Sequence, residues 1–396
     1  CGPVIRTLHN SEVERILRRG FASIGWDVNK NRAACASPPT MANIKDFLTR
    51  TLVLLTTYRP PLNQVSQAEL ADISLAAKKL WELDANRLTP GVDYAINLQR
   101  GKNFSDRGDA APEPLFKFVS AEVLQRPTYR TFMRLLDNYE KNTGQAEVVT
   151  REELQENQAF LNACLDTMPM QYAHKWLNRK GLAPADGPGF RRLLDQLWFS
   201  LYRREVHNDS SGFEHVFIGE SKAGKITGLH NWLQMYNEEK AGNLDYRGYI
   251  RPRVRGRGFS EPHDNEQLIT VQFSWDDEIK PVSTSLIGVS PEFELSLLTM
   301  CFLNGEKDTL VELGPYRAQV TAFPFKYRGQ NFIGSAFPGT APMTEDQAAR
   351  KLQSVTRGNQ CRKQGARAYQ EKKNEKAAAS KIQSLYRGRK VRTRDA

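Results

Sequence analysis

Cysteine is scarce in this chain of 396 residues, and the five cysteines are widely spaced. They are Cys1, Cys35, Cys164, Cys301 and Cys361, and no two form a Cys-x-x-Cys pair. An odd number of scattered cysteines argues against a disulfide framework, and the lack of paired ligands argues against a zinc site. Because reduced thiols suit the inside of a cell, we expect a cytoplasmic or other intracellular protein.

The sequence also lacks a long apolar run and a compact acidic loop. The apolar stretch at 51–55 is far too short to cross a membrane, because a spanning helix takes about 20 apolar residues. A hard cation needs several oxygen ligands, and no acidic loop offers such a cage. We therefore expect no membrane partner, and we expect the protein to be a monomer.

Net charge is nearly absent outside the C-terminal segment. The chain carries a formal charge of +11, and residues 344–396 contain 15 Lys and Arg against 5 Asp and Glu, a net of +10. The remainder therefore carries only +1. The basic character belongs to this tail, so it is no evidence for a basic binding surface elsewhere.

Apolar residues recur at helical spacing through the first half of the chain. Ser66 and Glu69 match a capping box, which is a side-chain pattern found at the start of a helix. We therefore expect a helix over 66–84. We expect further helices to complete a helical core. They lie after Pro127 and over 150–166, 169–180 and 188–204. Residues 1–65 form an N-terminal extension to which we assign no function.

Two histidines lie close together in the sequence where the pattern changes to strands and turns. Phe213, His215 and Phe217 alternate with other residues, which predicts a strand. A polar turn at 221–225 and a short returning strand at 226–230 would complete a hairpin that brings His215 and His230 to one end of the sheet. Two imidazoles facing a common space suit acid–base catalysis near neutral pH, and the alternative is that both are packed core residues.

The second half is otherwise rich in predicted strands, so we expect an α+β fold. Ser290 and Pro291 predict the start of a helix. The negative charges of Glu292 and Glu294 stabilise the positive end of the helix dipole at that N-terminus. We therefore interpret these two acids as structural. A helix is expected over 230–240, and strands are expected over 268–275, 282–289, 318–325 and 331–337.

Three segments together resemble the EndoU family of uridylate-selective endoribonucleases. They are Phe-Glu-His-Val-Phe-Ile-Gly-Glu at 213–220, His-Asn-Trp at 230–232 and Ser-Pro-Glu-Phe-Glu at 290–294. The resemblance extends from about residue 68 to 338. It implies an endoribonuclease domain over 66–340, with a helical N-terminal part followed by an antiparallel β-sheet catalytic part.

The resemblance also implies a catalytic trio of His215, His230 and Lys280. By analogy, His230 is the base that takes the proton of an RNA 2′-hydroxyl, and His215 is the acid that protonates the departing 5′-oxygen. The ammonium of Lys280 would stabilise the extra negative charge of the transition state. Glu214 and Glu220 match family acids that support activity, and the alternative is that they only orient the histidines or the loop.

The expected substrate is single-stranded RNA that contains uridylates, and the expected product is a 2′,3′-cyclic phosphate. Related enzymes read the uracil edge with a hydroxyl at the position of Thr284, which Ser285 follows. Phe337 replaces a Tyr of the family pattern, so stacking on the base would survive and a phenolic hydrogen bond would be lost. Animal members of the family are stimulated by Mn²⁺, so we expect this cofactor without naming a ligand.

The tail at 344–396 contains two segments, 352–362 and 382–392, that resemble calmodulin-binding IQ motifs. In such motifs, apolar residues enter a groove of calmodulin or a calmodulin-like protein, and basic residues face its acidic rim. The alternative is a solvated basic helix or an RNA-binding arm. The matching residues are Leu352, Gln353, Arg357, Gly358 and Arg362 in the first segment, and Ile382, Gln383, Arg387, Gly388 and Arg392 in the second.

The chain is thus expected to be an α+β RNA endonuclease with a basic helical, calmodulin-binding tail. A second hypothesis is a catalytically weak RNA-binding or scaffold protein that recruits calmodulin. The complete trio favours the first hypothesis.

Overall fold

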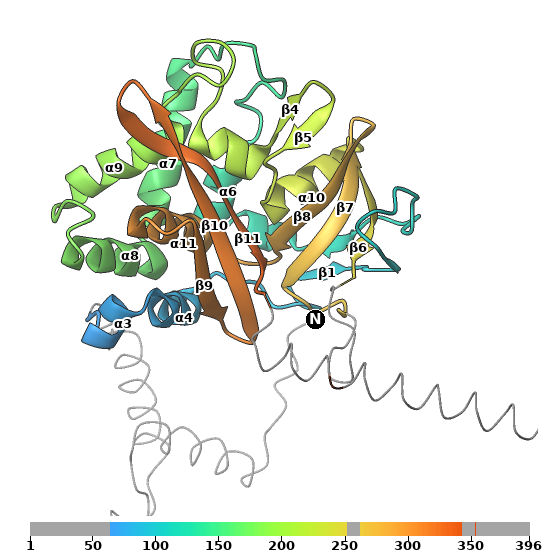
Figure 1. Cartoon of the computed structure of the whole chain (residues 1–396), viewed down its shortest axis with the longest axis horizontal. Coiled ribbons are helices and arrows are strands. Elements are labelled where there is room, and N and C mark those ends of the chain that lie inside the picture. The colour runs from blue at the N-terminus through green and yellow to red at the C-terminus, as the bar shows by residue number, and fades with distance from the viewer. Residues whose placement is uncertain (1–63, 252–261, 343–352, 354–396) are drawn as a thin grey trace, which may run out of the picture. The chain divides into compact units, whose positions relative to one another are not determined.

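A computed structural model describes residues 64–251, 262–342 and 353, and both IQ segments lie outside these residues, apart from Gln353 (Figure 1). The described chain is α+β, as predicted, with helices first and most strands later. No helix within it is long and apolar enough to cross a membrane.

The first part is mainly helical. The predicted capping box is confirmed, because the Ser66 and Glu69 side chains each accept from the other's backbone N–H. The single helix predicted over 66–84 is divided at Asp72, whose carboxylate accepts from Ser74 N and so starts a new helix. The helices are α3 (Gln67–Ala71), α4 (Ile73–Leu83), α5 (Ala121–Leu124), α6 (Pro127–Arg134), α7 (Arg151–Leu165), α8 (Met168–Arg179) and α9 (Gly187–Phe199).

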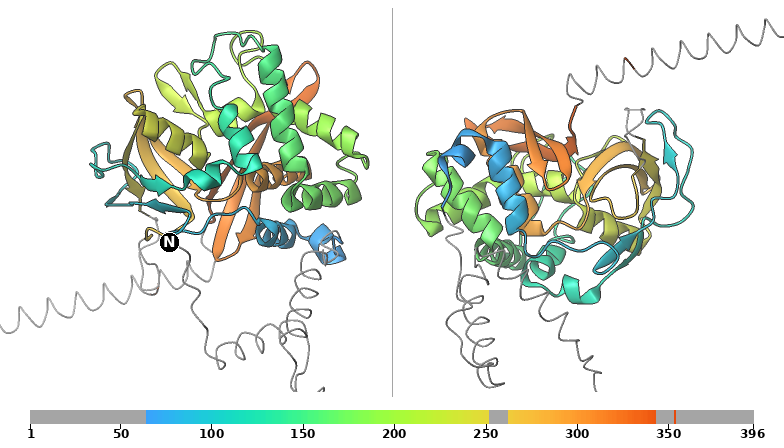
Figure 2. Two further views of the ribbon diagram at one scale, coloured as in Figure 1. Left: turned by 180° about the vertical axis from the view of Figure 1, so that it is seen from behind. Right: turned by 90° about the horizontal axis from the view of Figure 1, so that it is seen from below.

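Two sheets dominate the second part and lie side by side (Figure 2). One has the strand order β2 (Gly101–Lys102), β6 (Leu244–Ile250), β7 (Leu268–Trp275) and β8 (Glu278–Leu286), and only its β2–β6 pair is parallel. The other is antiparallel, with the order β11 (Gln330–Thr340), β10 (Tyr316–Tyr327) and β9 (Asp308–Leu313). Two small antiparallel pairs are β1 (Tyr94–Ile96) with β3 (Phe116–Val119), and β4 (Glu220–Lys222) with β5 (Lys225–Thr227).

Helix α11 (Pro291–Asn304) forms the centre of the core and contacts α4, α6, α8, β10 and β11. Ser290 caps it by accepting from Phe293 N, as predicted. Glu292 and Glu294 are buried and accept from the side chains of Asn86 and Asn231. Both acids therefore have structural partners, but these are asparagine side chains that the sequence did not predict, and burial raises the pKa of Glu294 to about 8, which weakens the predicted effect of its charge.

The predicted strand through His215 is wrong. Residues Glu214–Ile218 form a buried π-helical turn, η2. Ser211 Oγ accepts from Glu214 N, and Glu214 Oε2 accepts from Ser211 N, which is the reciprocal pattern of a capping box. This helix-start signal outweighs the alternation, which carries no information where every residue is buried.

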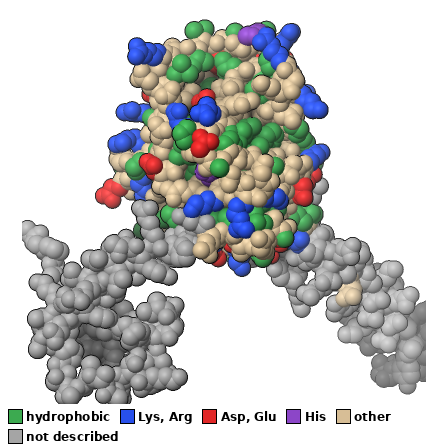
Figure 3. Space-filling model, turned by 90° about the vertical axis from the view of Figure 1, so that its left-hand side faces the viewer, with side chains coloured by type: hydrophobic (Ala, Val, Ile, Leu, Met, Phe, Trp, Pro, Cys, Tyr) green, Lys and Arg blue, Asp and Glu red, His purple; other side chains and the backbone are tan. Residues whose placement is uncertain are grey.

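Surface charge on the described residues is mixed. On the face shown in Figure 3, Lys and Arg side chains are spread among Asp and Glu and do not form one patch. This distribution fits the small net charge outside the tail.

Candidate active site

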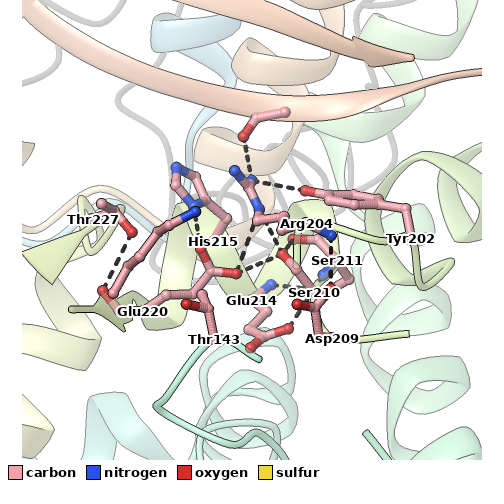
Figure 4. Close-up of polar contacts among 12 residues, drawn as sticks. Thr143, Tyr202, Arg204, Asp209, Ser210, Ser211, Glu214, His215, Glu220 and Thr227 are labelled. Carbon is pink, nitrogen blue, oxygen red and sulfur yellow. Dashed lines mark hydrogen bonds and ion pairs between the residues drawn. The ribbon is translucent and has the colours of Figure 1, made fainter. Parts of the chain in front are cut away.

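His215 is held by a carboxylate. It lies on η2, only 7% exposed, and its Nδ1 donates to Glu220 Oε2 at 2.6 Å (Figure 4). Because an ionised carboxylate only accepts, Nδ1 carries the proton and Nε2 is left for a substrate. Burial lowers the pKa of His215, and the hydrogen bond that His215 donates to Glu220 opposes that change.

Glu220 belongs to a buried polar network that the sequence did not reveal. Its Oε1 accepts from Ser210 Oγ at 2.5 Å and lies 3.6 Å from Arg204 Nε. Arg204 also donates to Ser210 Oγ, Tyr202 Oη and the Gly334 carbonyl of β11 (Figure 4). Burial by itself raises the pKa of Glu220, but His215 and Arg204 outweigh burial and hold the pKa below its ordinary value. The carboxylate therefore stays ionised beside the histidine.

Glu214 has a different environment from Glu220, although both acids match the family pattern. Glu214 is also buried, and its Oε2 accepts from Ser211 N. Burial, with the nearby charge of Glu220, raises the pKa of Glu214 to about 10. It is therefore a neutral acid at physiological pH, and its contact anchors the start of η2.

A backbone clamp joins His230 to the η2 turn. Leu229 N donates to the carbonyl of His215 at 3.2 Å, and His230 N donates to that of Val216 at 3.1 Å. Gly228 has a φ of +65°, and a Cβ there would lie 1.7 Å from the His215 carbonyl oxygen. The predicted hairpin is replaced by a shorter one, β4–β5, which starts at Glu220 and ends at Thr227, so both histidines lie beside it and not within it.

His230 has no carboxylate partner in the described structure. Its Nδ1 lies 3.4 Å from Ser283 Oγ, and that hydroxyl donates to the Leu229 carbonyl. The ring of Phe337 stacks on the imidazole with centroids 4.6 Å apart and planes 18° apart. Burial, followed by the charges of Lys280 and His215, lowers the pKa of His230 well below its ordinary value. The neutral imidazole is therefore favoured.

Lys280 approaches the same clamp from β8. Its Nζ donates to the Gly228 carbonyl at 2.5 Å, and burial lowers its pKa to about 8. Lys280 pairs with Phe273 and Ser283 with Val271, so the one residue between them on β7 faces two residues on β8. This β-bulge shifts the alternation and lets Lys280 and Ser283 both reach the 228–230 segment. Ser283 was missed because the bulge has no clear sequence signal.

The residues predicted to read uracil are not equivalent. Thr284 is 9% exposed, and its hydroxyl is 2.9 Å from that of Thr270 on β7. Ser285 is completely buried, and its hydroxyl donates to Met235 Sδ. The two side chains point to opposite faces of β8, and the buried hydroxyl of Ser285 is closed to a substrate, so the contact of Thr284 with uracil stays a prediction.

The catalytic centre does not fit a metal ion. Within residues 64–251 and 262–342, no group of three or more His, Cys, Asp or Glu side chains is arranged to hold one. The Glu220 oxygens already accept from His215 and Ser210, and Lys280 adds positive charge nearby. Manganese therefore has no ligand set among the catalytic candidates.

Comparison with known proteins supports the expected family. The model of the family "Endoribonuclease XendoU" matches residues 72–338, and the IQ calmodulin-binding motif matches 346–364 and 376–394. The uridylate-specific endoribonuclease B of Danio rerio is 42% identical over 276 residues, which are 67% of this chain and 95% of that protein. The poly(U)-specific endoribonuclease of Xenopus tropicalis is 44% identical over 279 residues, 67% of this chain and 92% of that protein.

A solved structure agrees with these matches. The structure described as XendoU, a splicing independent snoRNA processing endoribonuclease, is 42% identical in sequence to this chain. It superimposes with a TM-score of 0.60 over 71% of this chain and 99% of its own length. The chain therefore belongs to the XendoU family of endoribonucleases.

Proposed function

We propose that the protein cleaves single-stranded RNA at uridylates and leaves 2′,3′-cyclic phosphate ends. The observation that carries this proposal is the clamp at 228–230, which brings His215, His230 and Lys280 together. Relatives named uridylate-specific and poly(U)-specific support the choice of uridylate.

The reaction needs one proton taken and one proton given. The neutral imidazole of His230 accepts the proton of the 2′-hydroxyl, whose oxygen forms a bond to phosphorus. His215, held by Glu220, donates a proton to the 5′-oxygen as the bond from phosphorus to that oxygen breaks. No water is consumed in this transesterification.

Charge stabilisation comes from Lys280. Because burial lowers its pKa only to about 8, the ammonium persists at neutral pH. A fixed ammonium in a buried site stabilises the charge that grows on the phosphoryl oxygens. Stimulation by Mn²⁺ stays a prediction of the family resemblance, and no step above passes through a metal.

Cleavage of a short RNA with a single uridine, with and without Mn²⁺, tests this function. We expect a 2′,3′-cyclic phosphate on the 5′ product and a 5′-hydroxyl on the other. Binding without cleavage under both conditions would contradict the proposal and favour the scaffold hypothesis.

The IQ motifs indicate calmodulin binding, and we propose that occupancy of the tail alters access of RNA to the catalytic domain. RNA attraction needs mainly charge, whereas IQ recognition also needs Leu352 and Ile382 buried in a groove. Leu352→Asp with Ile382→Asp leaves the tail basic, so we expect loss of calmodulin binding in calorimetry at moderate salt. Equal binding by this variant and the wild type would show a purely electrostatic contact.

A further inference from the structure

Two aromatic side chains lie next to each other on the β11-β10-β9 sheet, beginning at the candidate catalytic centre. Phe337 of β11 stacks on His230, and Phe323 of β10 lies 6.5 Å from Phe337, centroid to centroid, with planes 40° apart. Phe323 pairs with Ser335, and Phe337 pairs with Thr321. Directly paired residues share a face of an antiparallel sheet, so the two rings are diagonal neighbours on one face.

Phe323 combines two features, since its aromatic side chain is 36% exposed and lies beside a lysine. Lys307 Nζ lies 4.8 Å from the centroid of the Phe323 ring. Ala322 N donates to the Lys307 carbonyl at 2.8 Å, which holds the lysine backbone next to the ring. Within residues 64–251 and 262–342, Lys307 forms no ion pair, so its ammonium is available to an external anion.

Neither of the acids next to Lys307 in the sequence, Glu306 and Asp308, forms an ion pair with it in the described structure. Asp308 Oδ1 accepts from Thr321 Oγ1 and Gln319 Nε2. Its carboxylate is thereby directed toward β10. An exposed ring next to an ammonium is the combination that binds single-stranded nucleic acids, because a base stacks on the ring and the cation contacts the phosphate.

We propose that Phe323 and Lys307 form a second nucleotide subsite, which holds the base and phosphate of a residue adjacent to the cleaved uridylate. The proposal rests on the proposed function, since it places this nucleotide next to the base at Phe337. The subsite binds through stacking and charge, so it accepts any base.

Substrate length tests the subsite. The reference substrate is a uridine 3′-phosphate methyl ester, which lacks an adjacent nucleotide. It is compared with two tetranucleotides, one with three adenosines on the 5′ side of the esterified uridine and one with three adenosines on the 3′ side of the uridine, and the measured quantity is the ratio of kcat/KM for tetranucleotide over reference. Loss of one stacked base costs ~1–3 kcal/mol, so Phe323→Ala should lower this ratio about 5- to 140-fold for the extension that reaches the subsite. Phe323→Trp should preserve it. Phe118→Ala is the control, because Phe118 is a 44% exposed phenylalanine on β3.

Salt dependence tests the lysine. Lys307→Gln should reduce the slope of log K against log salt by about 0.7, the value for one phosphate contact on a single strand. Lys326→Gln, an exposed lysine farther along β10, should leave the slope unchanged. An unchanged length ratio in Phe323→Ala, or an equal loss in Phe118→Ala, would overturn the subsite.

The failure of the subsite can be told apart from that of the proposed function. If the wild type cleaves no substrate, the proposed function fails, and binding of the tetranucleotides to His215→Ala with and without Phe323→Ala decides the subsite. Weaker binding after the second substitution would support it. Equal binding would reject it.

Discussion

The two histidines of the candidate site are equally buried but have opposite surroundings. His215 donates to an ionised carboxylate that Ser210 and Arg204 hold in place. His230 contacts a serine hydroxyl and an aromatic ring, and two positive groups add to the effect of burial on its pKa. A histidine stabilised in its charged form suits the acid, and one that resists protonation suits the base. The difference supports the proposed roles of His215 as acid and His230 as base, although burial lowers the pKa of both.

Removal of either imidazole should have the largest effect. His215→Ala, His230→Ala and Lys280→Ala should each reduce cleavage about 10²–10⁴-fold, the usual contribution of a general acid or base. RNA binding should persist, because substrate contacts elsewhere are unaffected. Single-turnover cleavage and filter binding measure the two quantities. Cleavage close to that of the wild type by any of the three variants would refute the assignment.

Gly228→Ala should break the clamp that brings the two histidines together. The new Cβ would overlap the His215 carbonyl oxygen, and the left-handed backbone disfavours alanine. Because misplacement of catalytic groups by ~1 Å can cost about 10²-fold, we expect at least that loss of kcat together with a lower Tm.

Gly242→Ala is the control for Gly228→Ala. Gly242 has a φ of +83° but open space around its Cα, so substitution there adds backbone strain without a clash. Equal losses in the two variants would show that the clamp is not required.

Glu220→Gln should bring the pKa of His215 closer to that of His230. The amide keeps an acceptor oxygen but removes the charge that raises the pKa of His215. The rate should rise with pH as His230 loses its proton and fall as His215 loses its own. Since burial lowers the pKa of both, and that of His230 more, the wild-type profile of kcat/KM should be a bell centred below the ordinary histidine pKa of about 6.5.

In Glu220→Gln the high-pH limb should move to lower pH, while the low-pH limb should stay in place. The maximum should fall about 10- to 100-fold, as is usual when a group that orients a functional histidine is lost. Glu214→Gln is a matched control, because Glu214 is already neutral at pH 7. If Glu214→Gln moves the limb equally, Glu220 is not the group that sets the pKa of His215.

Phe337→Tyr should have the smallest effect, because a tyrosine ring can still stack on His230. We expect kcat within a few-fold of the wild type, since the aromatic contact is worth only ~0.5–1.5 kcal/mol. The added hydroxyl should sharpen the preference for uridine over cytidine. Competition between U- and C-containing RNA measures this ratio, and equal rates at all four bases in the wild type would remove the uracil subsite altogether.

Local pattern was sufficient for much of the fold. The strand predicted over 268–275 coincides with β7, and the cap at Ser290 starts α11 as expected. The helix predicted over 188–204 ends earlier, at Phe199, since Tyr202 pairs with Ser210 in a short bridge. Helix capping and alternation depend on residues two to four positions apart, so the sequence contains them directly.

The sequence by itself determined the α+β class, the charged tail with its two IQ motifs and, through its motifs, the family and the candidate trio. Tertiary structure alone decided the turn at His215, the partnership of Glu220 with Ser210 and Arg204, the contact of Ser283 with His230 and the buried orientation of Ser285. Each of these depends on which groups meet inside a low-dielectric core. In such a core, burial shifts pKa values, and a single β-bulge changes which face of the sheet the following side chains point to. Neither effect can be read from the spacing of neighbouring residues in the sequence.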